Sequence, residues 1–73
     1  MIKELDCVKL LMDIPSEKLV EGDIGTVVDV YENGKAYEVE FLDAGGYTIA
    51  LTTLHPNQIS LASDQDIARP GRA

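Results

Sequence analysis

The sequence predicts an all-β protein, a small barrel of five short strands. Apolar and polar residues alternate with a period of two in several segments, and clusters of Gly, Pro, Asn and Asp separate these segments. Such alternation is typical of strands with one face on a core and the other in water. Because closure hides the sheet edges, short strands in a chain of 73 residues favour a barrel over an open sheet.

The central feature is a predicted hairpin from Val20 to Phe41. Asn33-Gly34 separates its two alternating runs and favours a type I′ turn, because both central positions of this turn need positive φ. Gly25 lies inside the first run, where a glycine marks a sharp bend or a close approach of two backbones. We expect the other strands to pack around this hairpin.

The alternation assigns a face to each residue of the hairpin strands. One face of the first strand consists of Ile24, Thr26, Val28 and Val30, and the opposite face of Gly25, Val27, Asp29 and Tyr31. In the second strand the alternating apolar residues are Tyr37, Val39 and Phe41. Between them, Glu38 and Glu40 must face solvent, because unpaired buried carboxylates cost several kcal/mol.

A further strand precedes the hairpin. The segment Cys7–Asp13 alternates, and its predicted core residues are Val8, Leu10 and Met12. The segment Ile14–Gly22 contains a proline and ends in a glycine-aspartate pair, which predicts a connecting loop. We expect Leu19 or Val20 in this loop to fold back over the mouth of the barrel.

Two short strands follow the hairpin. A turn at residues 43–46 leads into a predicted strand over 47–54, and the segment His55–Gln58 predicts one 3₁₀ turn. The last strand is expected at Ile59–Ala62. The barrel domain is therefore predicted over residues 1–62. Residues 63–73 have one large apolar residue, Ile67, and are expected to form a loosely attached tail.

The charge balance argues against nucleic acid as a partner. Thirteen acidic and six basic residues give a formal net charge of −7, and the bases are spread along the chain. Binding a phosphate backbone requires clustered Lys or Arg to replace counterions. The same charge favours long-range attraction to a basic partner.

The sequence indicates neither a metal site, a cofactor site nor catalytic residues. Cys7 and His55 are the only residues of their kinds, so a cluster of soft metal ligands cannot form. The N-terminus carries Glu4 and Asp6 and has no apolar signal region, and apolar runs are too short to span a membrane. We therefore expect a cytoplasmic protein that is not bound to a membrane.

Two surface features predict a partner interface, composed of Leu11, Val27, Asp29, Tyr31, Glu38 and Glu40. Three of these residues are apolar or aromatic and are predicted on faces away from the core, where a cluster marks an interface. The three acids form an outer face that a basic partner can bind. Paired carboxylates on a solvated strand have no pocket to perturb their pKa values, which argues against an enzyme.

Several stretches resemble known families. Residues 21–27, Glu-Gly-Asp-Ile-Gly-Thr-Val, are similar to the start of a KOW-type or other SH3-like barrel. Residues 3–6, 22–28, 36–41 and 48–51 together resemble a family of small bacterial proteins catalogued as a domain of unknown function. The resemblance covers residues 1–62 and implies an SH3-like barrel with no established activity. Some such proteins are encoded beside toxin-like genes, which implies an antitoxin or immunity role.

These observations favour a non-enzymatic interaction module that binds another protein or itself. A first alternative is nucleic-acid binding, which the KOW likeness implies, although the basic and aromatic surface that RNA binding needs is missing from the sequence. A second alternative is an accessory subunit of an enzyme, with Tyr47, His55 and the acids near a shared mouth.

Overall fold

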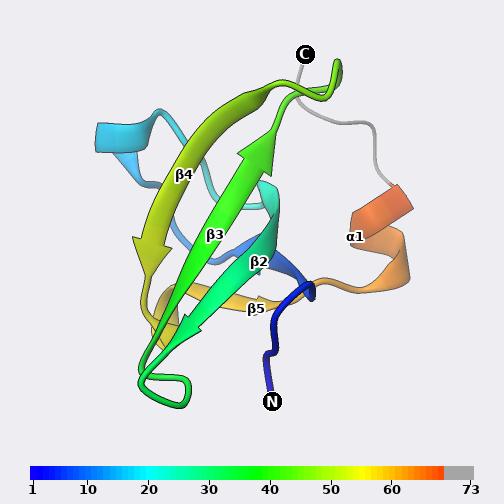
Figure 1. The fold of residues 1–73 in the computed structure, drawn as a ribbon. Helices are drawn as coiled ribbons and strands as arrows, with labels where there is room; N and C mark the ends of the chain where they lie inside the picture. Colours follow the sequence, from blue (N-terminus) through cyan, green and yellow to red (C-terminus); the bar gives the residue numbers. More distant parts are fainter. Residues whose placement is uncertain (69–73) are drawn as a thin grey trace.

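Five antiparallel strands form one sheet in the computed structural model, which describes residues 1–68 (Figure 1). The elements in chain order are β1 Cys7–Leu10, η1 Pro15–Glu17, β2 Ile24–Tyr31, β3 Ala36–Leu42, β4 Thr48–Leu54, η2 Pro56–Gln58, β5 Ile59–Leu61 and α1 Asp64–Ala68. The strand order across the sheet is β4-β3-β2-β1-β5. The five predicted strands and the 3₁₀ turn before the last strand are therefore confirmed.

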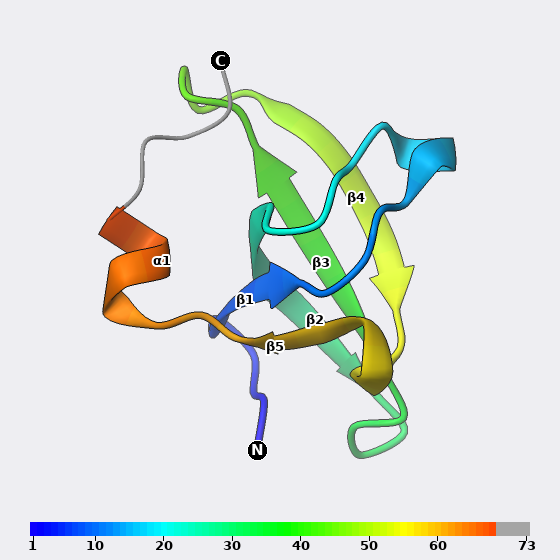
Figure 2. The same ribbon diagram turned by 180° about the vertical axis from the view of Figure 1, so that it is seen from behind.

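The sheet bends strongly so that its two ends approach one core. Figures 1 and 2 show β1 and β5 crossing the layer formed by β2, β3 and β4. The short η2 joins β4 to β5, the two strands at opposite ends of the strand order. An SH3-like barrel fits this five-stranded arrangement.

The turn between β2 and β3 lies one residue earlier than expected. The N–H of Gly34 donates to the carbonyl oxygen of Tyr31 at 3.0 Å. The central residues of this turn are therefore Glu32 and Asn33, with φ of 48° and 59°. Positive φ at both positions is the requirement of a type I′ turn. Gly34 follows with φ of 100°, which a residue without a Cβ adopts readily.

Because of a β-bulge at Val28, the predicted faces of β2 are reversed before the bulge and correct after it. Val27 pairs with Val39, whereas Asp29 pairs with Glu38, so Val28 is an extra residue in β2. Before the bulge, Val27 faces the core and is 0% exposed, which makes its predicted place at a surface interface wrong. After the bulge, Asp29 faces solvent and Val30 packs against the core. An extra residue changes the parity of a strand, and regular alternation cannot reveal it.

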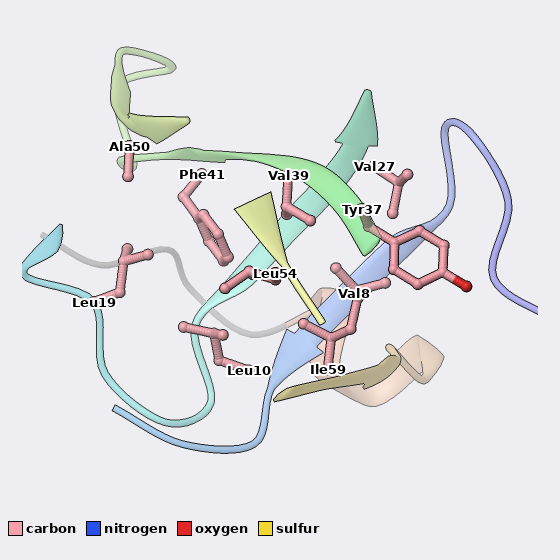
Figure 3. Packing of buried hydrophobic residues seen from close by; sticks show 10 residues of the cluster. All are labelled: Val8, Leu10, Leu19, Val27, Tyr37, Val39, Phe41, Ala50, Leu54 and Ile59. Atoms are coloured by element: carbon pink, nitrogen blue, oxygen red, sulfur yellow. The ribbon is translucent and has the colours of Figure 1, made fainter. Parts of the chain in front are cut away.

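The core receives a side chain from every strand and one from the β1–β2 loop (Figure 3). Its buried residues are Val8, Leu10, Leu19, Val27, Tyr37, Val39, Phe41, Ala50, Leu54 and Ile59. The three inward residues predicted for β3 are among them. Met12, also predicted in the core, is 42% exposed, because β1 ends at Leu10 and the alternation ends with it.

The segment after the barrel contains a short helix where a loose tail was expected. The hydroxyl of Ser63 accepts the N–H of Asp66 at 3.1 Å, and the carboxylate of Asp66 accepts the N–H of Ser63 at 2.9 Å. This reciprocal pair is a capping box that starts α1. The amide and hydroxyl of Ser63, then Lys9 at 3.4 Å, lower the pKa of Asp66. Residues 69–73, the rest of the predicted tail, lie outside the described residues.

We predict that Gly25→Ala destabilises the protein by about 1–3 kcal/mol, the usual effect of overpacking. A Cβ at Gly25 would lie 2.6 Å from Cγ1 of Val39 and 2.9 Å from the carbonyl oxygen of Glu40. The free energy of unfolding in urea measures the effect. Gly45→Ala is the control, because its nearest neighbour would lie at 3.4 Å. Equal stability of the two variants would contradict the close packing of β2 on β3.

We predict that Leu19→Ala lowers the free energy of unfolding by about 2–5 kcal/mol, as for other buried leucines. Leu19 is 1% exposed, whereas its neighbour Val20 is 46% exposed. Val20→Ala is therefore the matched control, with an expected change within about 0.5 kcal/mol. A similar loss for both variants would show that the β1–β2 loop does not fix Leu19 in the core.

Candidate functional site

Two carboxylates lie on the outer face of β3, because the residues that alternate with them are buried on its inner face. Tyr37, Val39 and Phe41 are buried, so Glu38 and Glu40 project to the opposite side. In the sheet, Glu38 lies between Asp29 of β2 and Thr53 of β4. The acids predicted to share a surface are thus neighbours across two strands.

Hydroxyl groups on both neighbouring strands hold Glu38 in place. Its Oε1 accepts the hydroxyl of Thr53 at 2.6 Å and the hydroxyl of Tyr31 at 3.3 Å. Partial removal from water raises the pKa of Tyr31, and the charge of Glu38, its hydrogen bond and the charge of Asp29 raise it further. Tyr31 therefore remains a protonated donor to the carboxylate over a wider range of pH.

The other two acids also have neutral hydrogen-bond donors. Oε2 of Glu40 accepts the hydroxyl of Thr48 at 2.8 Å, and Oδ1 of Asp29 accepts the N–H of Val30 at 2.9 Å. Hydroxyl and amide donors orient a carboxylate without neutralising it. The three acids thus form an oriented surface of negative charge.

Exposed apolar side chains lie beside these acids. Leu51 of β4 pairs with Glu40 and is 55% exposed, and Tyr47, just before β4, is 75% exposed. Leu42 and Ile49 are also exposed. We call this combined region the β3–β4 surface, composed of Glu38, Glu40, Leu42, Tyr47, Ile49, Leu51 and Thr53. A contiguous region of this kind is typical of an interaction surface.

In the strand predicted over 47–54, alternation with a period of two puts Tyr47, Ile49 and Leu51 on one face, but it does not indicate that this face is in solvent. The inward residues of β4 are Ala50 and Leu54. Ala50 pairs with Phe41, so a small residue of β4 lies beside a large one of β3. By hydrophobicity alone, the face with the larger residues would be expected inside.

The predicted interface residues divide into three groups. Asp29, Tyr31, Glu38 and Glu40 come together on the outer face. Leu11 is exposed, but it follows β1 and donates its N–H to the carbonyl oxygen of Gln58 in η2 at 2.9 Å. It therefore belongs to a different part of the surface, and the buried Val27 belongs to none.

The proposed mouth of Tyr47, His55 and the acids does not form. Tyr47 precedes β4 and His55 follows it, and a seven-residue strand spans about 23 Å. A shallow pocket of about 250 Å³ lies elsewhere, lined by Met1, Ile2, Lys3, Glu4, Val30, Asn33 and Gly34. Residues 1–68 contain no group of three or more His, Cys, Asp or Glu side chains arranged to hold a metal ion.

A protein-family model matches most of the chain. The model "Domain of unknown function (DUF4926)" matches residues 4–61, which include all five strands. The chain belongs to the DUF4926 family. The match covers the whole sheet and stops before α1. No curated protein and no solved structure matches the chain.

The DUF4926 match thus includes every residue of the β3–β4 surface. In the part of the chain that the structure describes, no helix combines the length and the apolar character that a membrane crossing requires.

We predict that Glu38→Gln lowers the pKa of Tyr31 toward its ordinary value. The amide oxygen still accepts a hydrogen bond, but the negative charge that disfavours the phenolate is gone. The raised pKa also means that stability from the Tyr31–Glu38 contact is present below the ordinary pKa and lost as pH rises through the folded value. Tyrosine ring shifts followed by NMR against pH measure the effect.

Glu40→Gln is the control for this titration, because Glu40 is two residues along the same strand and does not contribute to the raised pKa of Tyr31. An equal fall of the Tyr31 pKa in both variants would contradict a direct Tyr31–Glu38 contact.

Proposed function

We propose that this chain is a non-enzymatic interaction module that binds a basic protein partner through its β3–β4 surface. The observation that supports the proposal most strongly is the set of oriented, un-neutralised carboxylates of Glu38 and Glu40 beside exposed Leu51. Charge gives such a surface its partner preference, and exposed apolar groups give it area to bury.

The overall charge supports the same proposal. A net charge of −7 on 73 residues produces a negative field that raises the rate of encounter with a basic partner. The described ion pairs, Lys9–Asp66 and Lys35–Glu32, do not involve the acids of the β3–β4 surface. The field at that surface is therefore available to a partner.

The setting of the acids favours binding over catalysis. General acid–base chemistry needs a carboxyl group in a pocket that positions the reacting group beside it. Glu38 and Glu40 lie on an open strand face and accept hydroxyl donors from threonines of the neighbouring strand. An antitoxin or immunity protein is one form that such a module takes, and it remains a family-level expectation.

Affinity capture from the native lysate, with tagged wild-type protein and mass spectrometry, tests the proposal. We expect a stoichiometric basic protein whose binding weakens at high salt. Glu38→Gln/Glu40→Gln should raise its Kd roughly 2- to 30-fold, because exposed ion pairs contribute about 0.2–1 kcal/mol each.

Glu4→Gln/Glu21→Gln removes the same charge from two exposed residues outside the surface and is the matched control. Equal weakening by both double variants would indicate net charge alone and contradict docking at the β3–β4 surface. Light scattering of the same preparation separates a partner from self-association. A stable homodimer that captures no other protein would contradict a basic protein partner and indicate that the chain binds a second copy of itself.

A further inference from the structure

We propose that the free edge of β4 accepts an extended basic segment of the partner as an additional strand. This inference rests on the proposed function and assigns it a docking mode. β4 is at the end of the strand order, and within residues 1–68 it pairs with β3 alone. Its sequence, Thr-Ile-Ala-Leu-Thr-Thr-Leu, contains neither a charge nor a proline. Charges and prolines are the usual means by which exposed edges avoid pairing.

The hydrogen-bond pattern identifies which residues of β4 face the free edge. Val27 donates its N–H to Asp6 at 2.9 Å and accepts the N–H of Leu5 at 2.7 Å, so its backbone points away from β3. Val39, opposite Val27, therefore directs its backbone toward Thr52 of β4. Because direction alternates along a strand, the residues on either side of Thr52 direct their N–H and C=O groups outward.

These outward residues are Leu51 and Thr53, and the open edge has a defined end. The next N–H of the same parity, that of His55, is already donated to Oε1 of Gln58 at 2.8 Å. At the other end, η1 lies beyond the first part of β4 in both ribbon views (Figures 1 and 2). The backbone hydrogen bonds of the β1–β2 loop go to β1, to η2 and within the loop. Within residues 1–68, the edge-facing N–H and C=O groups of Leu51 and Thr53 therefore have no backbone hydrogen-bond partner.

Charge favours a basic segment over a second copy at this edge. Pairing β4 with β4 of a second copy would bring two chains of net charge −7 together. An added strand would lie about 9–10 Å from β3, two strand spacings away. A lysine or arginine on its outer face can lay its methylene stem over exposed Leu51 and place its charge near Glu40. The apolar and acidic parts of the β3–β4 surface would then bind different parts of one side chain.

The test uses two capped synthetic peptides with equal numbers of lysines. One alternates valine with lysine and favours a strand, and the other alternates glycine with lysine and keeps only the charge. We expect the valine peptide to bind, to weaken with salt, and to slow hydrogen exchange of the Leu51 and Thr53 amides in NMR spectra. The glycine peptide should bind at least about tenfold more weakly and leave that exchange unchanged.

Leu51→Pro removes an edge-facing N–H without removing a β3–β4 hydrogen bond, and Leu51→Val keeps the N–H. We expect Leu51→Pro to raise the Kd of the valine peptide about tenfold or more and Leu51→Val to raise this Kd by less than about threefold. An NMR spectrum of each variant reports whether it folds. If Leu51→Pro does not fold, exchange at Leu51 and Thr53 in the wild-type protein decides the question.

The outcomes separate this inference from the proposed function. Equal binding of both peptides, weakened by Glu38→Gln/Glu40→Gln without slower exchange at Leu51, would leave the acidic surface as the docking site and overturn strand addition. Failure of the valine peptide to bind would also overturn it, while capture from the lysate still decides the proposed function. Without peptide, slower hydrogen exchange of the β4 amides at higher protein concentration would show that a second copy binds the edge. That result would overturn the proposal that a basic segment binds there.

Discussion

The close approach of β2 to β3 at Gly25 is the constraint on which the remaining structure depends. A Cβ there would lie within 3 Å of side-chain atoms of Val39 and Phe41 and of the carbonyl oxygen of Glu40, so these groups of β3 pack directly against the backbone of Gly25. The bulge at Val28, three residues later in β2, strengthens the local twist. Together they let β2 pair with β3 on one side and with β1 on the other, while the sheet bends around one core. A 73-residue chain has material for only one such core.

The sequence predicted the strands because their signals are local. Alternation located β3 and its inward residues, and His55-Pro56 located the end of β4 and the start of η2. Gly25 was correctly interpreted as a point of close packing. These features depend on neighbours in the chain, which is the information that a single sequence contains most directly.

The predictions of which residues are buried were wrong where an extra residue changed the alternation of a strand, or where packing between distant segments decided burial. One extra residue at Val28 moved Val27 from the predicted surface into the core. Met12 continued the apolar alternation in the sequence, but the chain leaves β1 before it, and Leu19 from the following loop is buried in the core instead. Likewise, the acids of the candidate site were predicted, whereas the exposure of Leu51 follows from inward Ala50 beside Phe41.

The N-terminal residues have a consequence for how copies of this chain can assemble. Leu5 and Asp6, which precede the first residue of β1, bond to both backbone groups of Val27 and so cover β2 beyond the start of β1. At the far end of the strand order, β5 has only three residues. Within the described chain, β4 is therefore the one long open edge. Fibril growth needs two such edges on every molecule, so strand pairing between copies would close at a twofold dimer instead of propagating.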